Sequence, residues 1–163
     1  MSRAARVALT LATCIVLGAV GAHAYLDRVE PAVDGVLIGA PGELTLRFSM
    51  AVEGRFSTFE VHRLQAPPEA HPVELTAPSD RERQRLNALA AQLASSVLAG
   101  DRDGDPERVD DGSVSLADGN TVVTLGLRDD LPSGVYVLVW EVLAVDAHWT
   151  SGHVLLFVHA TSD

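Results

Sequence analysis

The stretch Asp129-Asp-Leu-Pro-Ser-Gly-Val-Tyr-Val-Leu-Val-Trp-Glu-Val-Leu-Ala-Val145 decides the fold of this chain. Its opening, Asp129 to Gly134, has the composition of a turn. The run that follows is rich in β-branched and aromatic residues, which favour extended backbone. Because both faces of this run are largely apolar, it predicts a central strand over 135–145 that is covered on both sides.

Shorter runs around this strand alternate polar and apolar residues, the pattern of half-buried strands. They cover residues 43–49, 57–63 and 121–127, and a final β-rich run covers 153–159. Turns rich in Gly and Pro separate them, and little of the chain has helical periodicity. The pattern predicts an all-β fold, either an antiparallel sandwich or a barrel.

One helix interrupts the strands over residues 79–99. Ser79 and Glu82 form a capping box, and Gly100 ends the run. Apolar residues recur at helical spacing, which predicts an amphipathic helix lying over the sheet or over an open end of the fold; they are Leu86, Leu89, Leu93 and Val97. A partner-binding helix is the alternative. The acidic run 101–111 that follows predicts a solvated loop.

The N-terminus has the layout of a secretory signal peptide. Arg3 and Arg6 precede the uncharged apolar run 7–20, and small residues follow it. The apolar run is shorter than a membrane-spanning helix requires. We therefore predict that residues 1–22 are removed and that the protein is exported, with no membrane span in the mature chain. Small-residue patterns allow a cut before His23 or before Tyr25.

Composition excludes several classes of function. The chain carries 12 basic residues, all arginine, against 22 acidic ones, a net charge of −10. Such a balance argues against nucleic-acid binding, which depends on neutralising phosphates. Its single cysteine, Cys14, can form neither an internal disulfide nor a thiolate zinc site, and it lies in the predicted signal peptide.

Two features together could form a metal site. A mature N-terminal His23 would offer its α-amine and its imidazole to one ion. Asp146-Ala147-His148 follows the long strand, and in extended backbone the side chains of Asp146 and His148 would point the same way. Nitrogen and oxygen ligands of this kind suit Cu(II). Taken alone, the Asp-x-His triplet is more often a local hydrogen-bonded pair, and a terminal histidine is often incidental.

A family resemblance joins the two features. The opening residues, His23-Ala-Tyr-Leu26, Glu30-Pro-Ala32 and the strand ending in Phe48-Ser49, resemble CopC/PcoC-type periplasmic copper-binding proteins. The closing residues resemble them more closely, with Leu131-Pro-Ser-Gly-Val-Tyr-Val137, Trp140, Asp146-Ala-His148, Ser151-Gly152 and Phe157-Val158 in that order. The resemblance covers residues 23–63 and about 113–159. Residues 64–112 stand outside it as an insertion made of the helix and the acidic loop.

The resemblance implies a Greek-key β-barrel or sandwich of Ig-like, cupredoxin-like architecture over residues 23–163. It also implies a Cu(II) site made of His23, Asp146 and His148, and it favours the cut before His23. The family often has an acidic residue where this chain has Met50, so acidic support would come from elsewhere, for example Glu53. His153 is either a fourth ligand or an outward strand residue, and we favour the second. His62, His71 and His159 are expected at the surface.

The function that these features predict is an exported, periplasmic or extracellular, Cu(II) chaperone or buffer in copper homeostasis or resistance. It is not expected to be an enzyme. Only Met1 and Met50 supply thioethers, so we expect no dedicated Cu(I) site. An inner-membrane copper transporter is the partner that the family implies. The alternatives are a copper enzyme like the lytic polysaccharide monooxygenases, or a metal-free Ig-like adhesion or assembly module.

Overall fold

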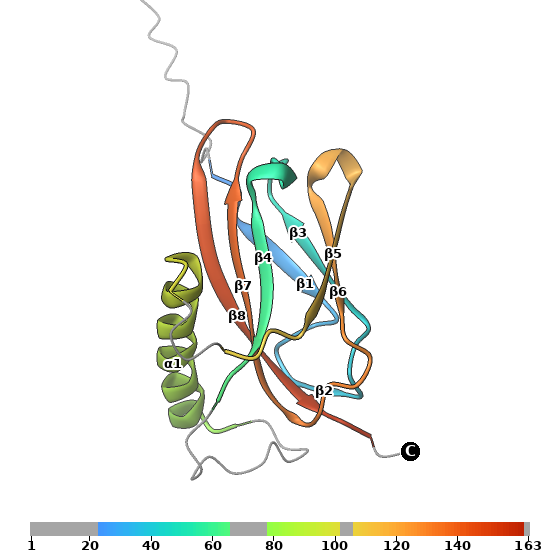
Figure 1. Ribbon diagram of the computed structural model, residues 1–163, viewed down its shortest axis with the longest axis vertical. Coiled ribbons are helices and arrows are strands. Elements are labelled where there is room, and N and C mark those ends of the chain that lie inside the picture. Colours follow the sequence, from blue (N-terminus) through green and yellow to red (C-terminus); the bar gives the residue numbers. More distant parts are fainter. Residues whose placement is uncertain (1–22, 66–77, 102–105, 162–163) are drawn as a thin grey trace, which may run out of the picture.

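The computed structural model describes residues 23–65, 78–101 and 106–161. Two sheets face each other across a common core (Figure 1). The first sheet has the strand order β1 (Leu26–Glu30), β3 (Glu43–Phe48), β6 (Val122–Leu127) and β5 (Asp110–Ala117). The second has the order β2 (Val36–Ile38), β8 (Trp149–His159), β7 (Gly134–Leu143) and β4 (Thr58–Arg63).

The expected all-β Greek-key fold with one added helix is confirmed, and the described strands form a sandwich of two sheets, not a closed barrel. Neighbouring strands pair antiparallel apart from β2, which runs parallel to β8. The predicted strands over 43–49, 57–63, 121–127 and 135–145 correspond to β3, β4, β6 and β7. The final strand, β8, begins four residues earlier than the predicted 153.

Strand β7 is covered on both faces, as its apolar composition predicts. Its even-numbered side chains, such as Tyr136 and Leu138, enter the core between the sheets together with Leu44 and Leu46 of β3. Its odd-numbered side chains face outward. Burial of both faces explains why this run lacks the polar alternation of the half-buried strands.

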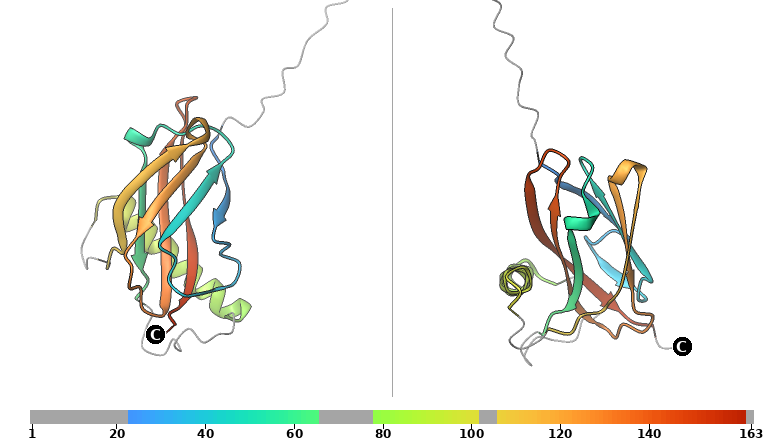
Figure 2. Two further views of the ribbon diagram at one scale, coloured as in Figure 1. Left: turned by 90° about the vertical axis from the view of Figure 1, so that its right-hand side faces the viewer. Right: turned by 45° about the horizontal axis from the view of Figure 1, so that its top comes forward.

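The helix α1 (Asp80–Leu98) covers the outward face of the second sheet (Figure 2). The Ser79 hydroxyl accepts a hydrogen bond from the Glu82 amide at 3.4 Å, so the predicted N-cap is present. Leu86, Ala90 and Ala94 pack against Val137, Val139 and Phe157 of the sheet. The helix therefore lies over the sheet, as expected. No helix in the described parts of the chain is long and apolar enough to cross a membrane.

A glycine on β8 makes room for the indole of Trp140. Gly152 pairs with Trp140 in the β7–β8 register. A Cβ atom at position 152 would overlap the ring atoms of that indole. The glycine of the closing motif thus has a packing role, because a side chain at Gly152 and the indole of Trp140 cannot occupy the same space.

Candidate metal centre

The turn between β7 and β8 carries Asp146 and His148. The Ala147 amide donates to the Ala144 carbonyl at 2.9 Å, and the Ala144 amide donates to the His148 carbonyl at 2.9 Å. Ala147 has a φ of 67°, the left-handed conformation that closes many three-residue hairpin loops. The expectation of extended backbone at Asp146–His148 is therefore wrong, because these residues form a tight turn.

The turn nevertheless brings the carboxylate and the imidazole together. Asp146 Oδ1 accepts a hydrogen bond from the His148 amide at 3.1 Å, and Asp146 Oδ2 lies 3.2 Å from His148 Nδ1. The side chain of Asp146 is 24% exposed, and that of His148 is 54% exposed. Oδ2 itself is buried and accepts no hydrogen bond in the described structure, because its contact with Nδ1 has the distance of an ion pair but lacks hydrogen-bond geometry.

His23 reaches the same place from the other end of the described chain. Its imidazole stacks on that of His148, with the ring centroids 5.2 Å apart and the planes inclined by 28°. The ring of Tyr25 also stacks on the His23 imidazole, with the ring centroids 5.9 Å apart. Two imidazoles and an unsatisfied carboxylate oxygen therefore lie side by side at this end of the sandwich.

Backbone pairing fixes the chain next to His23. The Ser49 amide donates to the Tyr25 carbonyl at 2.9 Å, which extends the β1–β3 pairing by one step. The hydroxyls of Ser49 and Thr150 also bind the backbone of residues 23–25. Neither residue carries a sequence motif that predicts this role. Their positions are the only signals, since Ser49 ends a predicted strand and Thr150 stands two residues after His148.

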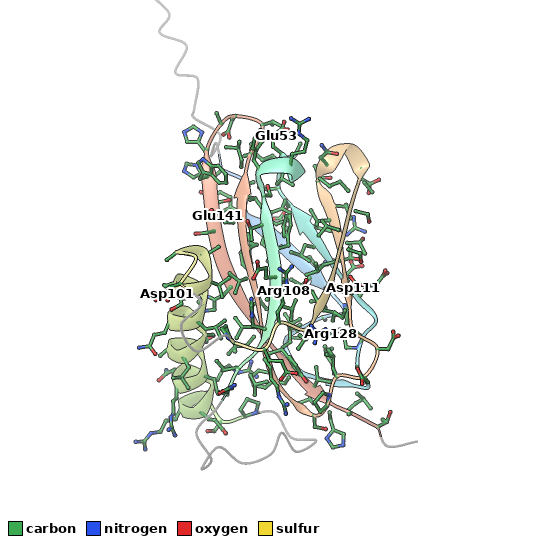
Figure 3. All side chains as sticks on the ribbon, in the orientation of Figure 1. Glu53, Asp101, Arg108, Asp111, Arg128 and Glu141 are labelled. Carbon is green, nitrogen blue, oxygen red and sulfur yellow. The ribbon has the colours of Figure 1, made fainter. Side chains whose placement is uncertain are left out.

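The two supporting candidates lie apart from this cluster. His153 pairs with Val139 on β8, at an odd-numbered position on the face that α1 covers. Among the described contacts, none joins His153 to His23, Asp146 or His148. Glu53 is exposed beside the short helix η1 (Gly54–Phe56), at the same end of the sandwich as the β7–β8 turn (Figure 3). Its amide donates to the Leu143 carbonyl at 2.8 Å, which ties its backbone to that hairpin.

The donors fit a metal ion in kind, although they are not assembled around one point. Within residues 23–65, 78–101 and 106–161, no group of three His, Cys, Asp or Glu side chains is arranged to hold an ion. The Oδ2 of Asp146 is the observation that favours a cation here, since it is buried without a hydrogen bond, lies 3.2 Å from the His148 imidazole and carries a desolvation cost.

A second polar cluster is buried on the outer side of β4. His62 is 2% exposed, its Nε2 lies 2.8 Å from Glu60 Oε2, and its Nδ1 lies 3.1 Å from the Pro106 carbonyl. Arg108 bonds both carboxylate oxygens of Asp110, which raises the pKa of the guanidinium above its ordinary value. Asp110 Oδ2 also accepts the Val61 amide at 2.9 Å. This cluster ties residues 106–110 to the edge of β4.

The cluster corrects two expectations. His62 is buried and not at the surface, because residues 106–110 cover the side of β4 that the alternating pattern left open. Asp110 is 4% exposed, so the end of the acidic run 101–111 is not a solvated loop but the buried start of β5. His159 is half-buried at the end of β8, and His71 lies outside the described residues.

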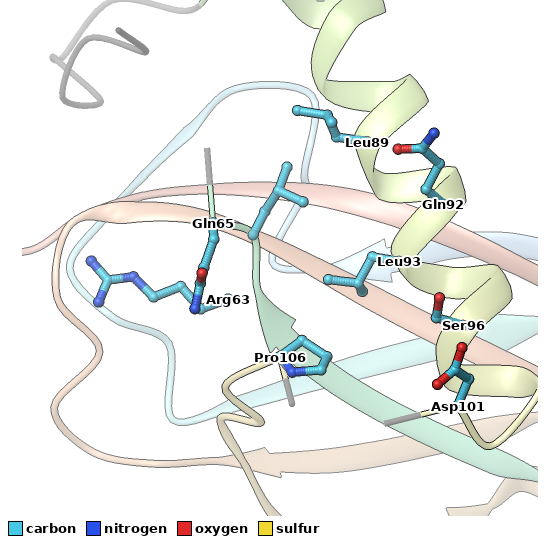
Figure 4. A pocket seen from close by; sticks show the side chains of 9 residues that line it. Arg63, Gln65, Leu89, Gln92, Leu93, Ser96, Asp101 and Pro106 are labelled. Atoms are coloured by element: carbon cyan, nitrogen blue, oxygen red, sulfur yellow. The ribbon is translucent and has the colours of Figure 1, made fainter. Parts of the chain in front are cut away.

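A pocket of about 280 Å³ lies between α1 and the end of β4 (Figure 4). Leu89 and Leu93 of the helix, together with Pro106, form much of its wall. Among the described residues, its lining includes one carboxylate, Asp101, and no histidine. Arg63 also lines the pocket and pairs with Tyr136, whereas Thr58, at the other end of β4, pairs with Glu141 near the β7–β8 turn. The pocket and the turn are therefore at opposite ends of β4.

The C-terminal part of the chain is similar to a known family. Residues 87–159, from the middle of α1 to the end of β8, match the model of the CopC domain. The CopC resemblance is confirmed. The matched region includes the CopC-like closing motif and the turn that carries Asp146 and His148.

Curated relatives and solved structures agree with the CopC match. Protein YobA of Escherichia coli strain K12 is 29% identical over 153 residues, which is 93% of this chain and 92% of YobA, and YobA of Shigella flexneri matches equally well. The crystal structure of PcoC, a methionine-rich copper resistance protein from Escherichia coli, matches with a TM-score of 0.53 and 17% identity. It covers 84% of this chain and 99% of PcoC.

CopC from Methylosinus trichosporium OB3b matches with a TM-score of 0.52 and 18% identity, over 86% of this chain and 98% of that protein. At these identities, the two structures establish that the fold is shared. The PcoC match is with a methionine-rich protein, whereas this chain has two methionines in all.

Proposed function

We propose that this protein is exported, is cut before His23, and binds one Cu(II) ion as a chaperone or buffer in copper homeostasis. His23, Asp146 and His148 are the proposed ligands. The observation that carries the proposal is the stacking of His23 on His148 beside the unsatisfied Oδ2 of Asp146. The CopC domain match and the copper-resistance proteins among the structural relatives supply the choice of metal.

The donor types favour Cu(II) over Cu(I). Cleavage before His23 would free an α-amine, which together with two imidazoles and a carboxylate gives three nitrogens and one oxygen. Such sets suit Cu(II), whereas Cu(I) prefers thiolates and thioethers. Residues 23–163 contain no cysteine and only Met50 as a thioether. Removal of residues 1–22 also removes Arg3 and Arg6 and shifts the net charge from −10 to −12, which favours cation uptake.

The chemistry proposed for this site is binding and release. The amine and both imidazoles must lose protons to coordinate copper, so binding strengthens as the pH rises towards neutrality. His148 lies on the exposed turn, and the open position of the turn allows an acceptor protein to approach the ion. An inner-membrane copper transporter, which the family resemblance implies, is the partner that we propose in a periplasmic setting.

Copper titration against a competing chelator tests the proposal. The exported protein should bind one equivalent of Cu(II), and both His148→Ala and a chain begun at Tyr25 should lose most of that affinity. His153→Ala is the matched control, because it removes a histidine of the same hairpin that pairs with Val139 on the outward face of the sheet, and it should bind as the parent does. Unchanged binding by His148→Ala would refute the assigned site.

A further inference from the structure

The backbone of residues 23–25 is held by two hydroxyl groups. Ser49 Oγ accepts a hydrogen bond from the Tyr25 amide at 3.0 Å and donates one to the His23 carbonyl at 3.2 Å. With the Ser49 amide bonded to the Tyr25 carbonyl at 2.9 Å, this single residue binds three backbone groups on the two sides of Ala24. These bonds help to set the direction in which the backbone leaves β1 towards His23.

Thr150 completes the attachment from the other sheet. Its Oγ1 donates to the Ala24 carbonyl at 2.8 Å. Thr150 belongs to β8 and lies two residues beyond His148. The same short segment therefore carries one proposed ligand, His148, and a hydroxyl that bonds the backbone next to the other, His23. Ala24 itself is 1% exposed and packs in the core between the sheets.

The two hydroxyls therefore fix three consecutive residues from both layers of the sandwich. Ser49 follows β3 in the first sheet, and Thr150 is in β8 of the second. A terminal segment without such bonds would sample many conformations, and metal binding would have to order it. Because these bonds hold the backbone, the centroid of the His23 imidazole lies 5.2 Å from that of the His148 imidazole in the structure.

We infer that Ser49 and Thr150 are positioning residues of the copper site, which set its affinity by ordering the backbone of His23 and touch no metal themselves. This inference rests on the proposed function, because it requires His23 to be a ligand. Partners that orient metal ligands typically change affinity by 10- to 100-fold when they are removed. Because these bonds hold backbone near the surface, we expect the lower end, a loss of about tenfold for each hydroxyl.

The test uses the exported, processed protein with its N-terminus verified by mass. Ser49→Ala and Thr150→Val each remove a hydroxyl, whereas Ser49→Thr and Thr150→Ser retain one. Ser133→Ala is the matched control, because Ser133 Oγ accepts the Ala160 amide at 2.9 Å at the opposite end of the β7–β8 hairpin. Cu(II) affinity is measured by competition, and the copper ligands by nitrogen couplings in electron paramagnetic resonance.

A metal-free readout accompanies these measurements. Hydrogen exchange at the Tyr25 amide should accelerate in Ser49→Ala, because this amide donates to the Ser49 hydroxyl, and should stay slow in Ser49→Thr. The expected result is a loss of about tenfold in Cu(II) affinity for Ser49→Ala and Thr150→Val, with recovery in the hydroxyl-retaining variants and no change in Ser133→Ala.

The outcomes separate this inference from the proposed function. If His23→Ala lowers affinity but Ser49→Ala and Thr150→Val bind within twofold of the parent, the inference is overturned and the proposed site stands. If His23→Ala itself has no effect on Cu(II) binding, the proposed site is wrong and the inference falls with it. If Ser49→Ala does not fold, Thr150→Val and its Thr150→Ser rescue decide the question in the same way.

Discussion

The imidazole of His23 stacks on the imidazole of His148 with 5.2 Å between the ring centroids, although the two residues stand near opposite ends of the chain. The pairing exists because β1 runs beside β3 in one sheet while β8 returns to the same end of the other. A copper site assembled from these two residues therefore depends on the whole sandwich and not on a local motif.

Two substitutions at Asp146 separate its charge from its role in the turn. Asp146→Asn keeps an oxygen that can accept the His148 amide, so the turn should persist and the free energy of unfolding should change by less than about 0.5 kcal/mol. Loss of the negative charge should lower Cu(II) affinity by about 10- to 100-fold. Asp146→Ala should lose a similar amount of affinity and a further ~1 kcal/mol of stability. Copper competition and urea unfolding measure both, and tight Cu(II) binding by Asp146→Asn would exclude the carboxylate as a ligand.

Gly152→Ala should destabilise the protein by about 1–3 kcal/mol, the usual cost of overpacking a core. The new methyl group would overlap the indole of Trp140, which is held between the two sheets. Gly35→Ala is the control, since a Cβ there meets nothing within 4 Å. Urea unfolding measures the difference, and equal stability of the two variants would show that the indole moves aside without cost.

Asp110→Ala should cost about 2–3 kcal/mol, because it leaves the Val61 amide without an acceptor and Arg108 without its principal partner. Asp111→Ala, at the next and exposed position, loses one exposed hydrogen bond from the Ser113 amide at 2.7 Å and should cost clearly less than Asp110→Ala. Thermal unfolding of the two variants checks the contrast. A small effect of Asp110→Ala would mean that solvent replaces the carboxylate readily.

Tyr136 links stability to alkaline pH. Its hydroxyl donates to the Pro132 carbonyl at 2.6 Å, and burial raises the pKa of the phenol above its ordinary value of 10.0. Because the folded state holds this proton more tightly, the stabilisation is complete below pH 10 and is lost as the pH rises through the folded-state pKa. Tyr136→Phe should be about 1 kcal/mol less stable at neutral pH, and its stability should fall less between pH 9 and 11 than that of the parent. A parallel decline of the two proteins would contradict this assignment.

Periodicity predicted the strands and the helix whose side chains face a core. It did not predict β1, β2 or β5. Strand β2 is too short to show alternation, and β5 has only its first residue, Asp110, buried. These strands form because neighbours supply hydrogen bonds to their backbone, and such long-range pairing leaves little trace in local composition.

The candidate site likewise combines local and long-range relationships. The proximity of Asp146 and His148 was predictable because they are two residues apart, although the structure brings them together through a turn and not through the expected extended backbone. Their approach to His23 required the family resemblance, since no local pattern relates residues so far apart in the chain. His62 was expected at the surface but is buried. The segment that buries it, residues 106–110, comes from a distant part of the sequence, so no local pattern predicts the contact.

Intact mass of the exported protein under native conditions, with and without Cu(II), tests the central claim most directly. The account predicts a chain of residues 23–163 that gains one copper ion, and a His148→Ala variant that is cut at the same place and gains none under the same conditions. A mature chain that begins elsewhere than His23, or a His148→Ala protein that retains the copper ion, would contradict it.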